Sequence, residues 1–347
     1  MPTKYSNPSD RDVEDKLIEV ARSLLGTEVN TVRFANSGRN GRVFKVVSNY
    51  NAFAMKFYPP LDKDSRDRLE TEYRAFSFLH DANLTVTPRA LARIDESRVA
   101  LYEWIDGSIV KDPSDADVDD VITFVRRIKE LSDATPQDTI GVATEASLSA
   151  QQLIHQIESR LQRLQAVAPG ENALAKFLAD DVVPAIASQT GMVRRDYTGR
   201  SAALSGEIKP SHRILSPSDF GFHNSIRCHN GPLIFVDFEY FGWDDPIRLV
   251  SDFVLHPGMK LSDNNRRRFV SASLDIFSTD DGFAHRLDLH YPLVVLRWCM
   301  ILLNEFLPEK WNARTATDTK FVEAVQLEQL KKAQVMLEHL SESPTKF

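Results

Sequence analysis

Apolar and polar positions follow two different periods along the chain. Residues 10–25 carry apolar side chains at helical spacing, and Gly26 supplies a stop signal. Between residues 29 and 57 the apolar positions alternate, and the segment VRFANSGRNGRVFKVVS contains a polar, glycine-containing turn. This pattern predicts a β-hairpin followed by a third strand. Pro59 and Pro60 end that strand, because proline cannot continue a ladder.

A change of composition near residue 105 predicts a boundary between two lobes. Residues 66–80 have the stripe of an amphipathic helix, and two further strands are expected around 90–94 and 98–104. The sequence IDG and the polar stretch KDPSDAD follow. We therefore expect an N-terminal lobe over residues 1–104 and a C-terminal lobe over residues 105–347.

The second lobe is predicted to be mostly helical. The polar stretch 191–212 predicts a long loop, and two short strands are expected around 216–227 and within PLIFVDFEY. The fold class is therefore α+β, with a small antiparallel sheet and a larger helical part. Apolar periodicity predicts helices over residues 118–132, 149–167, 173–187, 291–306 and 320–340.

Composition excludes several classes of protein. Lys and Arg number 42 against 49 Asp and Glu, a net charge of -7 over 347 residues, which disfavours nucleic-acid binding. Cys228 and Cys299 lack metal-type spacing and exclude a disulfide framework. The N-terminus has no apolar signal region, and the apolar stretch 291–303 is too short to span a bilayer. We expect a soluble, cytoplasmic protein without a membrane partner.

Three polar residues in the second half form a set suited to phosphoryl transfer. Asp219 is followed five residues later by Asn224, and Asp237 lies on the next predicted strand. Transfer from ATP needs a carboxylate to accept the proton of the attacking hydroxyl, together with oxygen ligands for magnesium. Each residue taken alone is better explained as a turn cap or a strand end, but the ordered set favours the catalytic interpretation.

A lysine in an apolar strand is the second candidate. Lys56 has apolar and aromatic neighbours, so it must extend to solvent or hold a partner. Glu70 and Glu72, on the following helix, are both candidates for that partner. Upstream, Gly38 and Gly41 lie in the hairpin turn, where backbone amides can cradle phosphates. A plain hairpin turn explains these two glycines equally well.

Taken in order, these features resemble the aminoglycoside phosphotransferase family, which is a branch of the protein-kinase-like fold together with the choline and homoserine kinases. The resemblance extends over roughly residues 29 to 255 and is strongest at 216–252. It implies a bilobal fold, the cofactors ATP and Mg²⁺, and a small-molecule hydroxyl as phosphate acceptor. The pattern of that family is an aspartate and an asparagine in one loop, followed by an aspartate with an aromatic neighbour.

The resemblance assigns a role to each matching residue. Asp219 falls on the catalytic aspartate, and Asn224 and Asp237 fall on the metal ligands. Lys56 falls on the lysine that contacts the phosphates, and Glu72 on its ion-pair partner.

The run LYEWIDG resembles the linker between the lobes. Its backbone is expected to bind adenine between Glu103 and Ile105.

Two departures from the family pattern leave alternatives open. Pro217 and Ser218 stand where the family carries His-Gly, which motivates a nucleotide-binding pseudokinase as a second hypothesis. No activation segment follows Asp237, which argues against a protein kinase.

The acceptor is expected to be a sugar, an amino sugar, an amino alcohol or an aminoglycoside. Acidic residues that an aminoglycoside would need cluster between 112 and 120, where they equally suit a helix N-terminus.

Overall fold

The computed structural model describes residues 8–37, 41–49, 51–62, 66–168, 172–229, 231–312 and 319–347. The chain divides into two compact units. The first comprises Met1–Val110 and Phe222–Phe241, and the second comprises Lys111–Gly221 and Gly242–Phe347. Residues 222–241, which we expected in the second lobe, therefore pack with the first unit.

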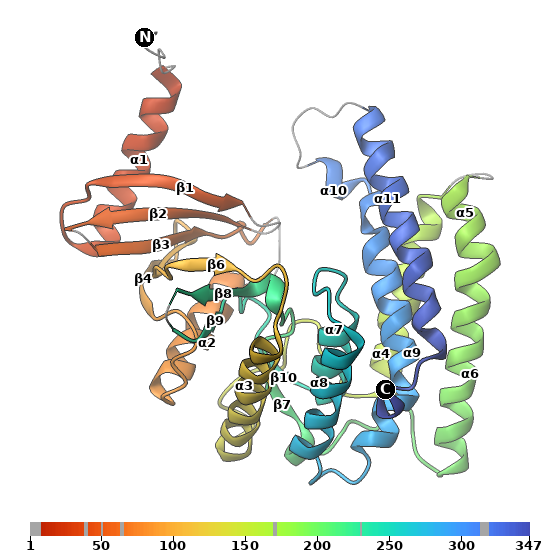
Figure 1. Ribbon diagram of the computed structural model, residues 1–347. Helices are drawn as coiled ribbons and strands as arrows, with labels where there is room; N and C mark the ends of the chain where they lie inside the picture. Colours follow the sequence, from red (N-terminus) through yellow and green to blue (C-terminus); the bar gives the residue numbers. More distant parts are fainter. Residues whose placement is uncertain are drawn as a thin grey trace. The chain divides into compact units, whose positions relative to one another are not determined.

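The first unit is built on a five-stranded sheet with the strand order β1-β2-β3-β5-β4 (Figure 1). Each pair of neighbouring strands is antiparallel, and the predicted hairpin and third strand are present. The strands are β1 (Thr31–Ser37), β2 (Arg42–Ser48), β3 (Asn51–Phe57), β4 (Ala90–Ile94) and β5 (Val99–Glu103).

The two faces of this sheet have different partners. Met55 and Leu101 point to one face, where they are buried against helix α1 (Pro8–Leu25). Because successive strand residues point to opposite faces, Lys56 lies on the other face, toward helix α2 (Arg68–Asp81). The alternation of β3 thus places the predicted lysine beside the predicted helix.

A second, three-stranded sheet joins the segment after β5 to residues 222–241. Its strand order is β6-β8-β9, with β6 (Gly107–Ile109), β8 (Ser225–Cys228) and β9 (Leu233–Phe235). A Cβ atom at Gly107 would lie 2.3 Å from the carbonyl oxygen of Arg227, so only glycine fits this close approach. The small sheet brings the predicted linker and the predicted metal ligands into one unit.

The second unit is helical apart from a short strand pair, β7 (Ile214–Ser216) with β10 (Gly242–Asp244). Helix α9 is largely buried and packs against α4, α6 and α11 (Figure 1). The helices are α3 (Asp115–Ala134), α4 (Ala150–Ala166), α5 (Ala173–Phe177), α6 (Val183–Gly199), α7 (Pro246–Leu255), α8 (Asp263–Ile276), α9 (Phe283–Leu302), α10 (Glu309–Asn312) and α11 (Thr319–Glu338). The predicted α+β class, an antiparallel sheet with a helical body, is confirmed.

The prediction of a loop over residues 191–212 is wrong for its first nine residues. Helix α6 continues to Gly199, because Val193 and Tyr197 are buried and extend its apolar stripe past Gly191. Tertiary packing thus outweighs the low helix propensity of glycine at this position. The helix expected from residue 291 likewise begins earlier, at Phe283.

Residues Phe283–Phe306 are long and apolar enough, by length and composition, to cross a membrane. However, 78% of the most apolar window of this stretch is buried inside the protein. The stretch therefore has the character of a core helix of the second unit. We expected a buried helix here, although the expectation that it is too short to span a bilayer is wrong.

His290 is a titratable group buried in this core helix. Its Nε2 atom lies 3.3 Å from the hydroxyl of Tyr197, and the two rings stack. Burial, reinforced by the positive charge of Arg286, lowers the pKa of His290 from 6.5 to about 3. The imidazole of His290 therefore binds a proton much less readily in the folded protein than in the unfolded chain.

We predict that His290 makes the second unit less stable in mild acid. The contribution of neutral His290 to the unfolding free energy is complete above the unfolded pKa of 6.5 and is lost as the pH falls toward 3. Between pH 7 and pH 5, His290→Gln should lose about 2 kcal/mol less unfolding free energy than the wild type, as measured by urea denaturation. His155→Gln, which replaces an exposed histidine, is the control and should show the same pH dependence of the unfolding free energy as the wild type. Equal pH slopes for wild type and His290→Gln would contradict the assignment.

Candidate functional site

The ammonium group of Lys56 lies among three carboxylates of the first unit. Its Nζ atom is 2.6 Å from Glu72 Oε2, 2.7 Å from Asp237 Oδ1 and 3.9 Å from Glu239 Oε2. Glu70 pairs with Arg93 instead, so the structure selects Glu72 as the partner of the lysine. The expected pairing of Lys56 with Glu72 is present, whereas the role of Lys56 in nucleotide binding stays a prediction.

This environment keeps Lys56 charged. Burial lowers the pKa of Lys56, but the charge of Asp237, followed by those of Glu72 and Glu239, more than offsets burial, so the pKa is raised well above its usual value. A permanently charged ammonium at the wall of a cavity can bind an anionic group such as a phosphate.

Glu72 is fixed by three hydrogen-bond donors. Its Oε2 atom accepts from Lys56 and, at 2.5 Å, from the hydroxyl of Tyr58, while Oε1 accepts from the backbone N–H of Phe238 at 3.2 Å. Glu72 is 2% exposed, so these donors replace the water that the carboxylate loses on burial. Helix α2 is thereby joined both to the sheet and to the segment after Asp237.

The hydrogen bond from Tyr58 to Glu72 determines the direction of a second hydrogen bond, between Tyr58 and Tyr102. The hydroxyl oxygens of Tyr58 and Tyr102 lie 2.7 Å apart. Since a hydroxyl has one proton and Tyr58 donates it to Glu72, Tyr102 must be the donor to Tyr58. Burial, and after it the charge of Glu72, raises the pKa of Tyr58, so its hydroxyl remains a donor.

Asp237 begins a short segment with an unusual backbone. Its φ of 69° lies in the left-handed region, which Asp tolerates better than most residues. Two positions later, Glu239 is buried and pairs with the guanidinium of Arg68, which also donates to the hydroxyl of Tyr240 at 2.7 Å. Burial, followed by the charge of Asp237, raises the pKa of Glu239 to about 7.

Beside these residues lies a cavity of about 590 Å³, lined only by residues of the first unit. Most of the predicted nucleotide and metal residues line it, namely Gly41, Lys56, Glu72, Glu103, Ile105, Asn224 and Asp237. Gly38 lies outside the described residues. At Gly41 a Cβ atom would be 2.7 Å from the carbonyl oxygen of Phe57, so glycine permits the turn to approach β3.

Asp219 belongs to the second unit. It follows Ser218, whose φ is 66°, and its backbone N–H donates to the carbonyl of Pro217 at 2.9 Å. A ring nitrogen of His256 lies within 4.8 Å of a carboxylate oxygen of Asp219.

Sequence reasoning missed three residues around these groups. Tyr58 could have been found, because it is two positions beyond Lys56 and therefore on the same side of the strand. Arg68 lies one helical turn before Glu72, which was a weaker signal. His256 is 37 positions from Asp219 and had no local signal at all.

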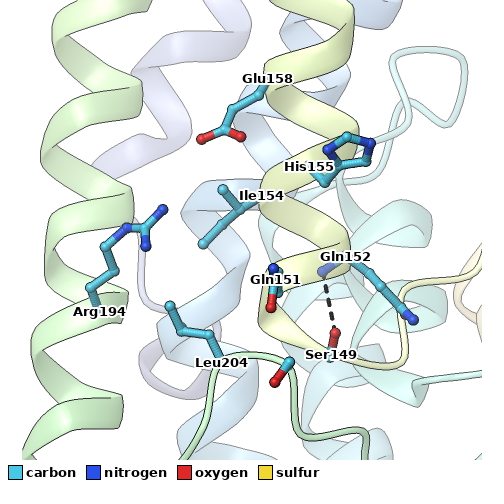
Figure 2. A pocket seen from close by; sticks show the side chains of 9 residues that line it. Ser149, Gln151, Gln152, Ile154, His155, Glu158, Arg194 and Leu204 are labelled. Carbon is cyan, nitrogen blue, oxygen red and sulfur yellow. Dashed lines mark hydrogen bonds between the residues drawn. The ribbon is translucent and has the colours of Figure 1, made fainter.

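The second unit contains a cavity of about 510 Å³ between α4, α6 and the residues after α6. Figure 2 shows Glu158 and Arg194 extending into it from α4 and α6, with Ile154 near both and Leu204 below them. Ser149 caps α4 at its edge by accepting from the N–H of Gln152. The polar residues of this cavity are mostly exposed, and it brings together none of the predicted site residues.

Comparisons with known proteins give one family and one fold. No curated protein sequence matches the chain. The model of the phosphotransferase enzyme family matches residues 31–272.

Among solved structures, spectinomycin phosphotransferase APH(9)-Ia, in complex with ADP and spectinomycin, has a TM-score of 0.62 at 11% identity, over 93% of this chain and 98% of its own. Choline kinase LicA from Streptococcus pneumoniae has a TM-score of 0.59 at 15% identity, over 94% and 99%. ADP-bound aminoglycoside phosphotransferase APH(2'')-Ib has a TM-score of 0.58 at 14% identity, over 93% and 98%. At these identities the likeness shows the protein-kinase-like fold that we expected.

The direction of the hydrogen bonds, from Tyr102 to Tyr58 and from Tyr58 to Glu72, can be tested by measuring the stability of two variants. Tyr58→Phe leaves Glu72 with one donor fewer and Tyr102 without its acceptor, so we expect a loss of about 1–3 kcal/mol in unfolding free energy. Tyr102→Phe leaves the bond between Tyr58 and Glu72 intact and should cost less than about 1 kcal/mol. Urea denaturation at neutral pH measures both losses. A larger loss for Tyr102→Phe would reverse the proposed direction of these hydrogen bonds.

Proposed function

The chain belongs to the phosphotransferase enzyme family, and from that premise we propose that it transfers the γ-phosphate of ATP, with Mg²⁺, to a hydroxyl of a small polar metabolite. The family resemblance and the enzyme class expected from the sequence are confirmed. The observation that carries the proposal is the charged Lys56, which lies between Glu72 and Asp237 at the wall of the large cavity of the first unit.

In the proposed complex this cavity binds the nucleotide. Residues Glu103 to Ile105 line this cavity, and we assign the hydrogen bonds with a purine base to their backbone. Lys56 lines the same cavity and binds the phosphates as a point charge, with Gly41 close by. Two of the similar structures contain ADP, which supports ATP as the phosphate donor.

The residues present fit a magnesium ion. The amide oxygen of Asn224 and the carboxylate of Asp237 are hard oxygen ligands that line this cavity, and the Asp237 side chain is 37% exposed. Among the described residues of this cluster, three carboxylates face two cations, Lys56 and Arg68, so a polyanion needs an accompanying cation to enter. When bound, the metal neutralises charge on the phosphates.

We assign the proton transfer to Asp219. Its carboxylate orients the acceptor hydroxyl and takes its proton, while the hydroxyl oxygen forms a bond to the γ-phosphorus and ADP leaves. Pro217 and Ser218 shape the turn that carries Asp219 but supply no charge. A pseudokinase would keep the nucleotide cavity and lack this step.

The acceptor class is a sugar, an amino sugar, an amino alcohol or an aminoglycoside. The acidic residues near α3 give little support to a polycationic drug, because two of them, Asp117 and Asp119, are used in the fold. Asp117 forms a capping box with Ser114, and Asp119 makes two bonds of 2.7 Å to Arg268. A less highly charged metabolite is therefore the favoured acceptor.

The proposed compartment is the cytoplasm. Cys228 and Cys299 are both free thiols, which suits a reducing environment.

The test of the proposed function is the variant Asp219→Asn. It keeps the size of the side chain but removes its basicity, so we expect kcat to fall about 10²–10⁴-fold while ATP binding stays nearly unchanged. A coupled ADP-release assay with sugars, amino alcohols and aminoglycosides identifies the acceptor and measures kcat. Turnover of Asp219→Asn close to the wild type would exclude Asp219 as the base. Magnesium-dependent ATP binding without any acceptor would favour the pseudokinase.

A further inference from the structure

The turn that carries Asp219 is held by local bonds. Strand β7 ends at Ser216, and the Oγ atom of this residue accepts from the N–H of Ser218 at 3.1 Å. Ser218 has a left-handed backbone, and the N–H of Asp219 bonds back to Pro217. These contacts fix the backbone of the turn. These bonds do not include the Asp219 carboxylate.

His256 is placed beside this turn by the topology of the second unit. Strand β7 pairs with β10, helix α7 follows β10 directly, and His256 is the residue that ends α7. A ring nitrogen of His256 lies within 4.8 Å of a carboxylate oxygen of Asp219. That distance allows a hydrogen bond either directly or through one water molecule.

The imidazole ring of His256 is held from two sides. Its Nδ1 atom accepts from the N–H of Gly258 at 3.1 Å, and its ring meets the indole of Trp298 edge to face at 4.8 Å. Trp298 is fixed in turn, because its Nε1 atom donates to Asp252 at 2.8 Å, and Asp252 accepts from Arg248 at 3.0 Å.

This geometry assigns the tautomer. With Nδ1 acting as an acceptor, the proton of the neutral ring is carried by Nε2, an assignment made from the hydrogen-bond pattern. Nε2–H is then the donor that remains for a neighbouring carboxylate.

We propose that His256 is the positioning residue of Asp219, and that it orients the carboxylate through Nε2–H so that Asp219 can accept the proton of the substrate hydroxyl. The proposal rests on the proposed function of Asp219 as the base. The imidazole keeps its own proton throughout: the substrate O–H bond breaks, its proton moves to Asp219, and His256 holds the carboxylate before and after the transfer.

The contact is tested by nuclear magnetic resonance, independently of any acceptor. The signal of the His256 ring is assigned by its absence in His256→Gln, and its pKa is measured in the wild type and in Asp219→Asn. Loss of the neighbouring negative charge should lower the measured pKa of His256 by about one pH unit.

The other charged groups near the ring do not change between the two proteins. In the second unit these are Lys260, Asp263, Arg266, Glu328, Lys331, Lys332 and His339, which line a cavity with His256, and Asp252 behind Trp298. The difference in pKa therefore isolates Asp219. Equal pKa values in the two proteins overturn the proposal, whether or not the protein is a kinase.

The role of the contact is tested by kinetics on the acceptor found in the assay. His256→Gln retains an N–H at the end of the side chain and should keep kcat within about threefold, whereas His256→Leu should lose about tenfold or more, with KM for ATP unchanged. In the Asp219→Asn background His256→Leu should cause no further loss, because the two residues act as one unit. His155→Leu, in the cavity of Figure 2, is the matched control.

Two outcomes would contradict a positioning role. Equal losses for the Gln and Leu variants would mean that His256 serves only to pack against Trp298. Full additivity with Asp219→Asn would mean that it acts elsewhere. A fully active Asp219→Asn, by contrast, refutes the base assignment and leaves the measured contact between the two side chains standing.

Discussion

A lysine ammonium keeps its charge in a protein interior only if opposite charges compensate for the lost water. Lys56 is 12% exposed and obtains this compensation from residues on two distant segments, Glu72 on α2 and Asp237 and Glu239 beyond β9. The segment 222–241 is therefore bound to the five-stranded sheet by charge as well as by packing. The division of the chain follows from this constraint, because these residues join the first unit although the sequence on both sides of them belongs to the second.

The same constraint organises the chemistry of the first unit. Lys56 cannot leave Glu72 and Asp237 without removing the cation closest to both, so in the proposed function a nucleotide binds where the ammonium already points. Donors on every side of Glu72 restrict that carboxylate, and Arg68 restricts Glu239. Asp237 is the most exposed of the three carboxylates, so it can exchange Lys56 for another partner. The fold alone does not select the acceptor, since structures of similar fold are named for substrates as different as spectinomycin and choline.

Much of this arrangement could be predicted from the sequence. An apolar strand that contains a lysine demands a partner, and the next helix offers only a few carboxylates to supply it. The ordered spacing of Asp219, Asn224 and Asp237 in the sequence indicates phosphoryl transfer.

Other features could not be predicted, because they depend on contacts between distant segments. The direction of the hydrogen bond from Tyr102 to Tyr58 follows only from the place of Glu72. His256 reaches Asp219 only through the pairing of β7 with β10. The continuation of α6 beyond Gly191 depends on the burial of Val193 and Tyr197, which cannot be predicted from local helix propensity.

The central claim is that the ammonium of Lys56 binds the phosphates of a nucleotide. Calorimetric titration of ATP with Mg²⁺, and of adenosine as the phosphate-free control, into wild type and Lys56→Met tests it most directly. The account predicts that ATP affinity falls about 10- to 100-fold, as expected for the loss of one charge-assisted bond, while adenosine affinity stays the same. Equal ATP affinity in the two proteins, or a parallel loss for adenosine, would contradict it.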